Sequence, residues 1–119
     1  MLQVTSKSLE SVTLFELNGR FDTHTVNSLR QLLEPATGQP PAQIVVDLTA
    51  VNFVDSTALA ALVQGMKRSR QQGGDLRLCG LGQGVRIIFE LTRLDRAFDI
   101  FAKPGAAVQS FQTEKVAQP

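Results

Sequence analysis

The sequence has few of the side chains that most often carry catalysis or bind metals. Its 119 residues include one cysteine and one histidine, and neither tryptophan nor tyrosine. Because Cys79 has no second cysteine, an intrachain disulfide and a multi-cysteine zinc site are both excluded, which fits a reducing compartment. His24 lacks partners for a metal site or a catalytic triad, so a surface or capping role is the simpler interpretation. We therefore expect a protein that is not an enzyme and holds no metal or cofactor.

Charge of one sign and long apolar runs are also scarce. The 12 basic residues nearly balance the 11 acidic ones, for a net charge of +1, which gives no electrostatic reason to expect a nucleic-acid or anionic-membrane partner. The longest unbroken apolar run, 58–63, is far too short to span a bilayer, and the opening MLQVTSKSLE lacks the pattern of a secretory signal. We expect a cytoplasmic protein without a membrane partner.

Short runs of β-forming residues predict a mixed sheet of about four or five strands. Residues 2–5 and 12–17 read as a hairpin joined by the polar turn KSLES, and the continuous apolar run 44–48 is typical of a central strand covered on both faces. Further strands are expected at 75–79 and, as a short edge strand, at 98–101. Because helical patterns alternate with the later strands, the chain is expected to form an α/β fold.

Apolar residues at helical spacing predict about four helices. The first contains Val26, Leu29, Leu32 and Leu33, with Asp22 or Thr23 as N-cap and Pro35 after its last turn. The second begins at 56 and ends at Gly73-Gly74, the third has a buried stripe at positions 85, 88, 89 and 92, and the last starts at Pro104 and includes positions 108 and 111. We expect one domain over 1–119, with a core of about 2–112 and a frayed tail at 113–119.

Motifs that suggest phosphate or metal chemistry are incomplete. The turn GLGQGV at 80–85 lacks the third glycine of a dinucleotide-binding loop and the Lys-Ser/Thr of a Walker A loop, so it is expected to be a strand-to-helix turn. Asp22, Asp47 and Asp55 recur near strand ends, where caps and solubilising residues are common. A deep pocket between these aspartates and the glycine turn would instead favour a small-ligand or nucleotide binder.

The polar step Asp55-Ser56-Thr57, inside the apolar stretch FVDSTALAALV at 53–63, allows two interpretations. In the simpler one, Ser56 is the N-cap of the following helix and Asp55 adds favourable negative charge at the helix start. In the other, Ser56 presents an exposed hydroxyl that can be phosphorylated without disrupting the fold.

The stretch IVVDLTAVNFVDSTALAALV at 44–63 resembles the central motif of the anti-sigma factor antagonists built on the STAS domain. LNGRFDTHTVNSLRQLL at 17–33 and GGDLRLCGL at 73–81 are similar to two further elements of that family, in the same order, and the resemblance covers about residues 4–111. It implies a bacterial regulator whose serine after the motif aspartate, here Ser56, is phosphorylated by an anti-sigma factor with serine kinase activity. Phosphorylation would abolish binding, and a serine phosphatase would restore it.

The same resemblance implies that Asp22 and Asp55 flank the phosphorylation site, that Thr57 takes the place of a second hydroxyl, and that Ala58 replaces a usual glycine. Together with Ser56, these residues are expected to form the partner surface on the second helix and its preceding loop. The alternatives are a STAS scaffold or a partner-switching regulator with a non-sigma target, and a small-ligand or nucleotide-binding STAS domain. No feature of the sequence selects an oligomeric state.

Overall fold

The hairpin that opens the chain is longer than its sequence pattern indicates. The computed structural model describes the backbone of residues 1–117 and the side chains of residues 1–112. Strands β1 (Leu2–Leu9) and β2 (Val12–Phe21) pair antiparallel from Leu2↔Gly19 to Leu9↔Val12. Most of the expected KSLES turn therefore belongs to β1. The reversal takes only Glu10 and Ser11, with Glu10 in a left-handed conformation at φ 58°.

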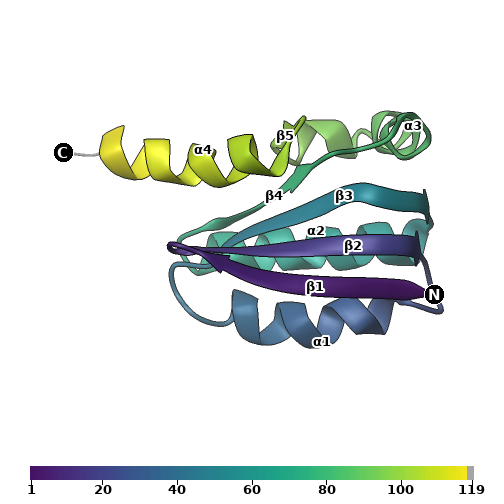
Figure 1. Cartoon of the computed structure of the whole chain (residues 1–119), viewed down its shortest axis with the longest axis horizontal. Helices are drawn as coiled ribbons and strands as arrows, with labels where there is room; N and C mark the ends of the chain where they lie inside the picture. The colour runs from purple at the N-terminus through teal and green to yellow at the C-terminus, as the bar shows by residue number, and fades with distance from the viewer. Residues whose placement is uncertain (118–119) are drawn as a thin grey trace.

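The central position predicted for the 44–48 strand is confirmed. Strand β3 (Gln43–Val54) lies third in the sheet order β1-β2-β3-β4-β5, and it pairs in parallel with β2 and with β4 (Asp75–Cys79). The short edge strand β5 (Ile100–Phe101) pairs in parallel with β4. One antiparallel pair and three parallel pairs make the expected mixed sheet (Figure 1).

Alternate residues of β3 explain why its sequence is apolar without interruption. Ile44, Val46 and Leu48 belong to a large core cluster with residues of α1 (Val26–Thr37), α2 (Ser56–Gln71) and α3 (Gln83–Leu91). Val45 faces the opposite side and belongs to a smaller cluster with Val108 of α4 (Pro104–Ala117). Both faces of the strand are covered, as parallel central strands require. Figure 1 shows α2 running behind β2 and β3.

Two expectations for the first helix are wrong. The N-cap of α1 is Thr25, and neither Asp22 nor Thr23 takes that position, because the carbonyl oxygen of Asp22 accepts hydrogen bonds from the backbone N–H groups of Thr25 and Val26 in a turn before the helix. Pro35 lies inside α1 and does not follow it. The helix continues past Pro35 to Thr37, which is buried and whose hydroxyl donates to the carbonyl oxygen of Leu33 at 2.9 Å.

Smaller differences appear in α1 and in the segment from α3 to β5. Leu32 and Thr92, both expected in buried stripes, are exposed, and Thr92 is the C-cap of α3. The edge strand starts at Ile100 because Phe98 is buried edge-on against Phe89, with ring centroids 6.0 Å apart. The expected tail at 113–119 stays a prediction: α4 continues to Ala117, and residues 118–119 lie outside the described residues.

A buried ion pair anchors α4 to the sheet. Arg77 of β4 is 5% exposed, and its Nε lies 3.1 Å from Asp75 Oδ2. Its Nη1 donates to Ser110 Oγ of α4 at 2.7 Å, and its guanidinium stacks 4.0 Å from the ring centroid of Phe111. Arg70 Nε also donates to Asp75, at 3.0 Å, so this carboxylate has two cationic partners. Within residues 1–117, no helix combines the length and hydropathy that a membrane span needs.

Candidate functional site

The candidate site lies where two parallel strands end at the same edge of the sheet. Phe21, the last residue of β2, pairs with Val54, the last residue of β3. The residues that follow, Asp22 and Asp55, are therefore brought together although they are 33 positions apart in the sequence. The carboxyl ends of neighbouring parallel strands commonly form the binding edge of an α/β sheet.

Ser56 is the first residue of α2, and it is not the N-cap. The cap is Asp55, which has an extended backbone (φ −122°, ψ −177°) and accepts from the backbone N–H of Ala58 through Oδ1 at 3.0 Å. The interpretation of Ser56 as the cap is therefore wrong. Ser56 is exposed, and among the described residues its hydroxyl has no hydrogen-bond partner.

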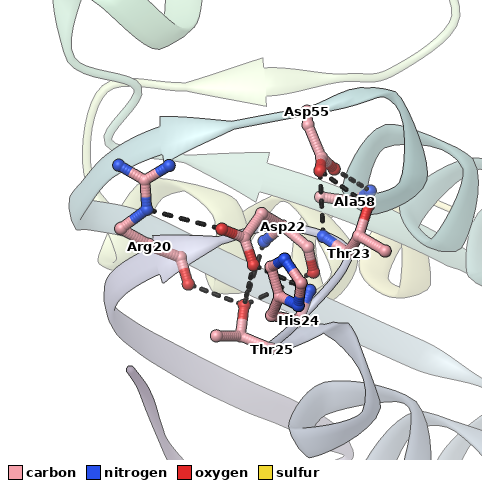
Figure 2. A network of polar contacts seen from close by, with 7 residues as sticks. All are labelled: Arg20, Asp22, Thr23, His24, Thr25, Asp55 and Ala58. Atoms are coloured by element: carbon pink, nitrogen blue, oxygen red, sulfur yellow. Dashed lines mark hydrogen bonds and ion pairs between the residues drawn. The ribbon is translucent and has the colours of Figure 1, made fainter.

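A set of three residues, which we call the Thr23 network, joins the loop after β2 to the start of α2. It comprises Thr23, Asp55 and Thr57. The backbone N–H and the hydroxyl of Thr23 both donate to Asp55 Oδ2, each at 2.9 Å, and Thr23 Oγ1 also lies 2.9 Å from Thr57 Oγ1. Figure 2 shows Thr23 pointing at the Asp55 carboxylate, with Asp22 on the near side of the same loop. The sheet edge and the helix start are thus fixed to one another.

The Asp22 carboxylate is 7% exposed and is held by its own loop. Oδ1 accepts from the backbone N–H of His24 at 2.9 Å, and Oδ2 lies 3.4 Å from Arg20 Nε (Figure 2). Burial alone would raise the pKa of Asp22, but the hydrogen bonds from His24, Arg20 and Thr25 outweigh it and lower the pKa below its ordinary value. Asp22 is therefore an anion near neutral pH.

Asp55 is also held in its charged form. The hydrogen bond from the backbone N–H of Ala58 is the largest cause that lowers the pKa of Asp55, and the two hydrogen bonds from Thr23 lower it further. Together these bonds outweigh desolvation, which would raise the pKa. The exposed hydroxyl of Ser56 thus lies directly after one carboxylate and at the same sheet edge as a second.

An open groove of about 580 Å³ runs from Ser56 along α2. Its walls are mainly the apolar side chains of Leu59, Val63 and Leu94, and Lys67 lies at its other end; Ala60 and Gln64 complete the lining. A hydroxyl at the end of an apolar groove is suited to regulating a protein contact, because a charge added there is costly to desolvate.

Comparison with known proteins identifies the family. Residues 3–107 match the sequence profile described as STAS domain. The chain belongs to the STAS domain family. The anti-sigma-B factor antagonist of Bacillus subtilis (strain 168) is 32% identical over 108 residues, which cover 91% of this chain and 98% of that protein.

Solved structures share the fold of this STAS domain. An anti-sigma factor antagonist from Mycobacterium paratuberculosis has a TM-score of 0.83 at 23% identity, over 92% of this chain and 93% of that one. The Bacillus cell fate determinant SpoIIAA in its phosphorylated form has a TM-score of 0.70 at 19% identity, over 93% of this chain and 99% of that one. The predicted α/β fold with a mixed sheet and about four helices is confirmed.

The structure brings most of the expected site residues of this STAS domain together. Asp22, Asp55 and Thr57 surround the start of α2, where Ser56 is exposed and Thr57 is half-buried. Ala58 differs, because it is fully buried in the core cluster and offers no surface to a partner. The methyl group that distinguishes it from the usual glycine therefore packs inside the molecule.

Sequence reasoning missed Thr23 as a member of the site. The sequence pattern predicts only an N-cap role for Thr23, whereas in the structure its backbone N–H and its hydroxyl both donate to Asp55 Oδ2. The usable signal is its place two residues after the end of β2, a strand that runs parallel to the strand before Asp55.

The aspartates do not gather as one group around the glycine turn: Asp47 adjoins Gly80, whereas Asp22 and Asp55 follow the ends of β2 and β3. Asp47 lies on the opposite face of the sheet, where its carboxylate accepts from the backbone N–H of Thr49 at 3.0 Å. Among the described residues, no three histidine, cysteine or acidic side chains are grouped to hold a metal ion. Cys79 is buried, and burial together with the nearby Asp47 raises the pKa of its thiol to about 12. A thiol with such a pKa stays protonated and unreactive.

Proposed function

We propose that this STAS domain is an anti-sigma factor antagonist, a protein-binding regulator and not an enzyme. In its unphosphorylated form it binds an anti-sigma factor that has serine kinase activity. The name of the 32% identical relative from Bacillus subtilis, which matches over nearly its full length, supports this choice of partner. The groove along α2 has apolar walls and ends near the ionised Asp55, and such a combination of apolar and charged surface suits a protein partner.

One observation carries the proposal: the Ser56 hydroxyl is exposed at the start of α2, while another residue caps the helix. Phosphorylation of Ser56 therefore breaks no native hydrogen bond among the described residues. In the transfer, the bond from Ser56 Oγ to phosphorus forms as the bond from phosphorus to the nucleoside diphosphate leaving group breaks, and the hydroxyl proton passes to a base of the kinase. The nucleoside triphosphate is the phosphoryl donor.

The added charge accounts for the loss of binding. A phosphoserine carries about −1.5 to −2 charges at neutral pH. Here it would stand beside the ionised Asp55 and at the end of an apolar groove, so any partner would have to desolvate two adjacent negative groups at once. A serine phosphatase reverses the step when water attacks phosphorus and Ser56 regains its hydroxyl.

The test measures binding to the purified anti-sigma factor kinase from the same genome, by calorimetry, together with site mapping after incubation with ATP. We expect one phosphate, on Ser56, and a large loss of affinity for the phosphorylated chain. Ser56→Ala should bind with or without ATP, and Ser56→Asp or Ser56→Glu should bind weakly. Ser8→Asp, an exposed serine on the opening hairpin, is the matched charge control and should bind like the parent.

Other outcomes would redirect the proposal. Equal binding by Ser56→Ala, Ser56→Asp and the parent, with ATP present, would remove Ser56 from the switch. A chain that binds no anti-sigma factor and carries no phosphate would point to a scaffold or to a regulator with a non-sigma target. A nucleotide retained through purification would point to a ligand-binding STAS domain.

A further inference from the structure

Two neighbouring hydroxyls stand at the start of α2, and the structure treats them differently. Ser56 is exposed and makes no hydrogen bond among the described residues, whereas Thr57 is half-buried and its Oγ1 lies 2.9 Å from Thr23 Oγ1. Both have the chemistry of a phosphoacceptor. What separates them is the Thr23 network, whose Thr23–Asp55 part is drawn in Figure 2.

The protons of the Thr23 network can be assigned from its donors and acceptors. The Asp55 carboxylate can only accept, because its hydrogen bonds hold it ionised. Thr23 has one hydroxyl proton, and Asp55 Oδ2 receives it at 2.9 Å. The contact between the two threonine hydroxyls is therefore satisfied only if Thr57 donates its own proton to Thr23 Oγ1. The Thr57 hydroxyl is thus directed toward the exposed Thr23 side chain in the loop after β2.

We propose that Thr23 determines which of the two hydroxyls is phosphorylated, by holding Thr57 so that only Ser56 reaches the kinase. The proposal rests on the proposed function, because it concerns the choice that the serine kinase makes. Thr23 is a positioning residue, since it acts through Thr57 and Asp55 and touches neither the nucleotide nor the reacting oxygen of Ser56.

Phosphorylation of residue 57 would require that its hydroxyl turn toward the kinase and give up its hydrogen bond to Thr23. The loss of one such bond corresponds to a rate lower by roughly tenfold. Ser56 needs no such rearrangement.

The test gives the kinase one serine hydroxyl, at position 57, and varies only Thr23. The double variant Ser56→Ala/Thr57→Ser keeps Thr23 and removes the preference of a kinase for serine over threonine. Adding Thr23→Val deletes the hydroxyl but keeps the size of the side chain and the backbone N–H that donates to Asp55. Adding Thr23→Ser instead restores the hydroxyl and is the matched control. Each protein is incubated with the kinase and ATP, and phosphate on residue 57 is followed by mass spectrometry.

We expect the parent to be phosphorylated on Ser56, the double variant and its Thr23→Ser derivative to react slowly, and the Thr23→Val derivative to carry phosphate on residue 57 about tenfold faster than the double variant. Equal rates for all three variants, with unchanged kinase affinity, would overturn the role of Thr23 and leave the proposed function intact. A parent that takes no phosphate would overturn the proposed function, and this inference with it. Thermal melts of each variant establish that the chain is folded.

Discussion

Asp55 and Ser56 stand side by side at the start of α2, and replacing each by alanine should have very different effects on stability. Asp55→Ala removes the cap acceptor of the Ala58 N–H and leaves the two Thr23 donors without their carboxylate. A lost N-cap costs about 1 kcal/mol, and the lost bonds to a charged acceptor at a partly exposed site cost about as much again. We expect the free energy of unfolding to fall by about 2 to 3 kcal/mol for Asp55→Ala.

Ser56→Ala removes no hydrogen bond among the described residues and places a better helix former in the first turn, so its effect should stay within about 0.5 kcal/mol. Urea unfolding of both variants measures the contrast directly, and thermal melts should show a decrease of roughly 4 °C per kcal/mol for a chain of this size. Asp55→Asn keeps a cap acceptor and should lie between the two. If Ser56→Ala costs as much as Asp55→Ala, Ser56 takes part in the cap and the assignment made here is wrong.

Three further predictions concern the rest of the domain. The folded-state pKa values of Asp22 and Asp55 lie below the ordinary value of 3.8, so the stability that the two carboxylates contribute is present above that pH and is lost as the pH falls through the lowered values. Thermal melts of the parent at a series of pH values should show this loss of stability. Asp22→Asn or Asp55→Asn should make the melting temperature depend less on pH. Gly74→Ala should destabilise the domain by about 1 to 3 kcal/mol because a Cβ there would overlap the backbone carbonyl of Ala42. Gly84→Ala, in open space on α3, should stabilise it by up to about 1 kcal/mol. Urea unfolding measures both variants, and equal effects would contradict the packing argument. Arg77→Met removes one of the two cationic partners of the buried Asp75 carboxylate while Arg70 remains, and it should cost about 2 to 3 kcal/mol. Lys7→Met, in the exposed Lys7–Glu16 pair, should cost less than about 1 kcal/mol, again by urea unfolding.

The sequence predicted best the strands and helices in which buried apolar residues recur at a regular spacing. The apolar run around Val45 indicated a strand covered on both faces, and the spacing of Leu59, Leu62 and Met66 indicated the buried face of α2. Such patterns are visible without the fold because each reports many contacts of the same kind. Single positions were harder to predict: Pro35 lies inside the last turns of α1, although proline in a helix interior usually ends or bends the helix.

The candidate site shows the same division. Sequence reasoning and the family resemblance selected Asp22, Asp55, Ser56 and Thr57, and the structure places all four at one edge of the sheet. Two adjacent residues with similar capping preference compete for the N-cap, and propensity alone does not choose between aspartate and serine. Thr23 decides the outcome, because its two hydrogen bonds fix the Asp55 carboxylate from a loop distant in sequence.

The sequence by itself determined the class of fold, the order of its strands and helices, and the polar step that marks the site, because these follow from composition and from periodic burial. Only the tertiary structure decided that Asp55 is the cap, that Ala58 is buried, and that the Ser56 hydroxyl is the one left exposed. The reason is that β2 and β3 end side by side, and Thr23 in the loop after β2 then binds the Asp55 carboxylate and the Thr57 hydroxyl but not the Ser56 hydroxyl.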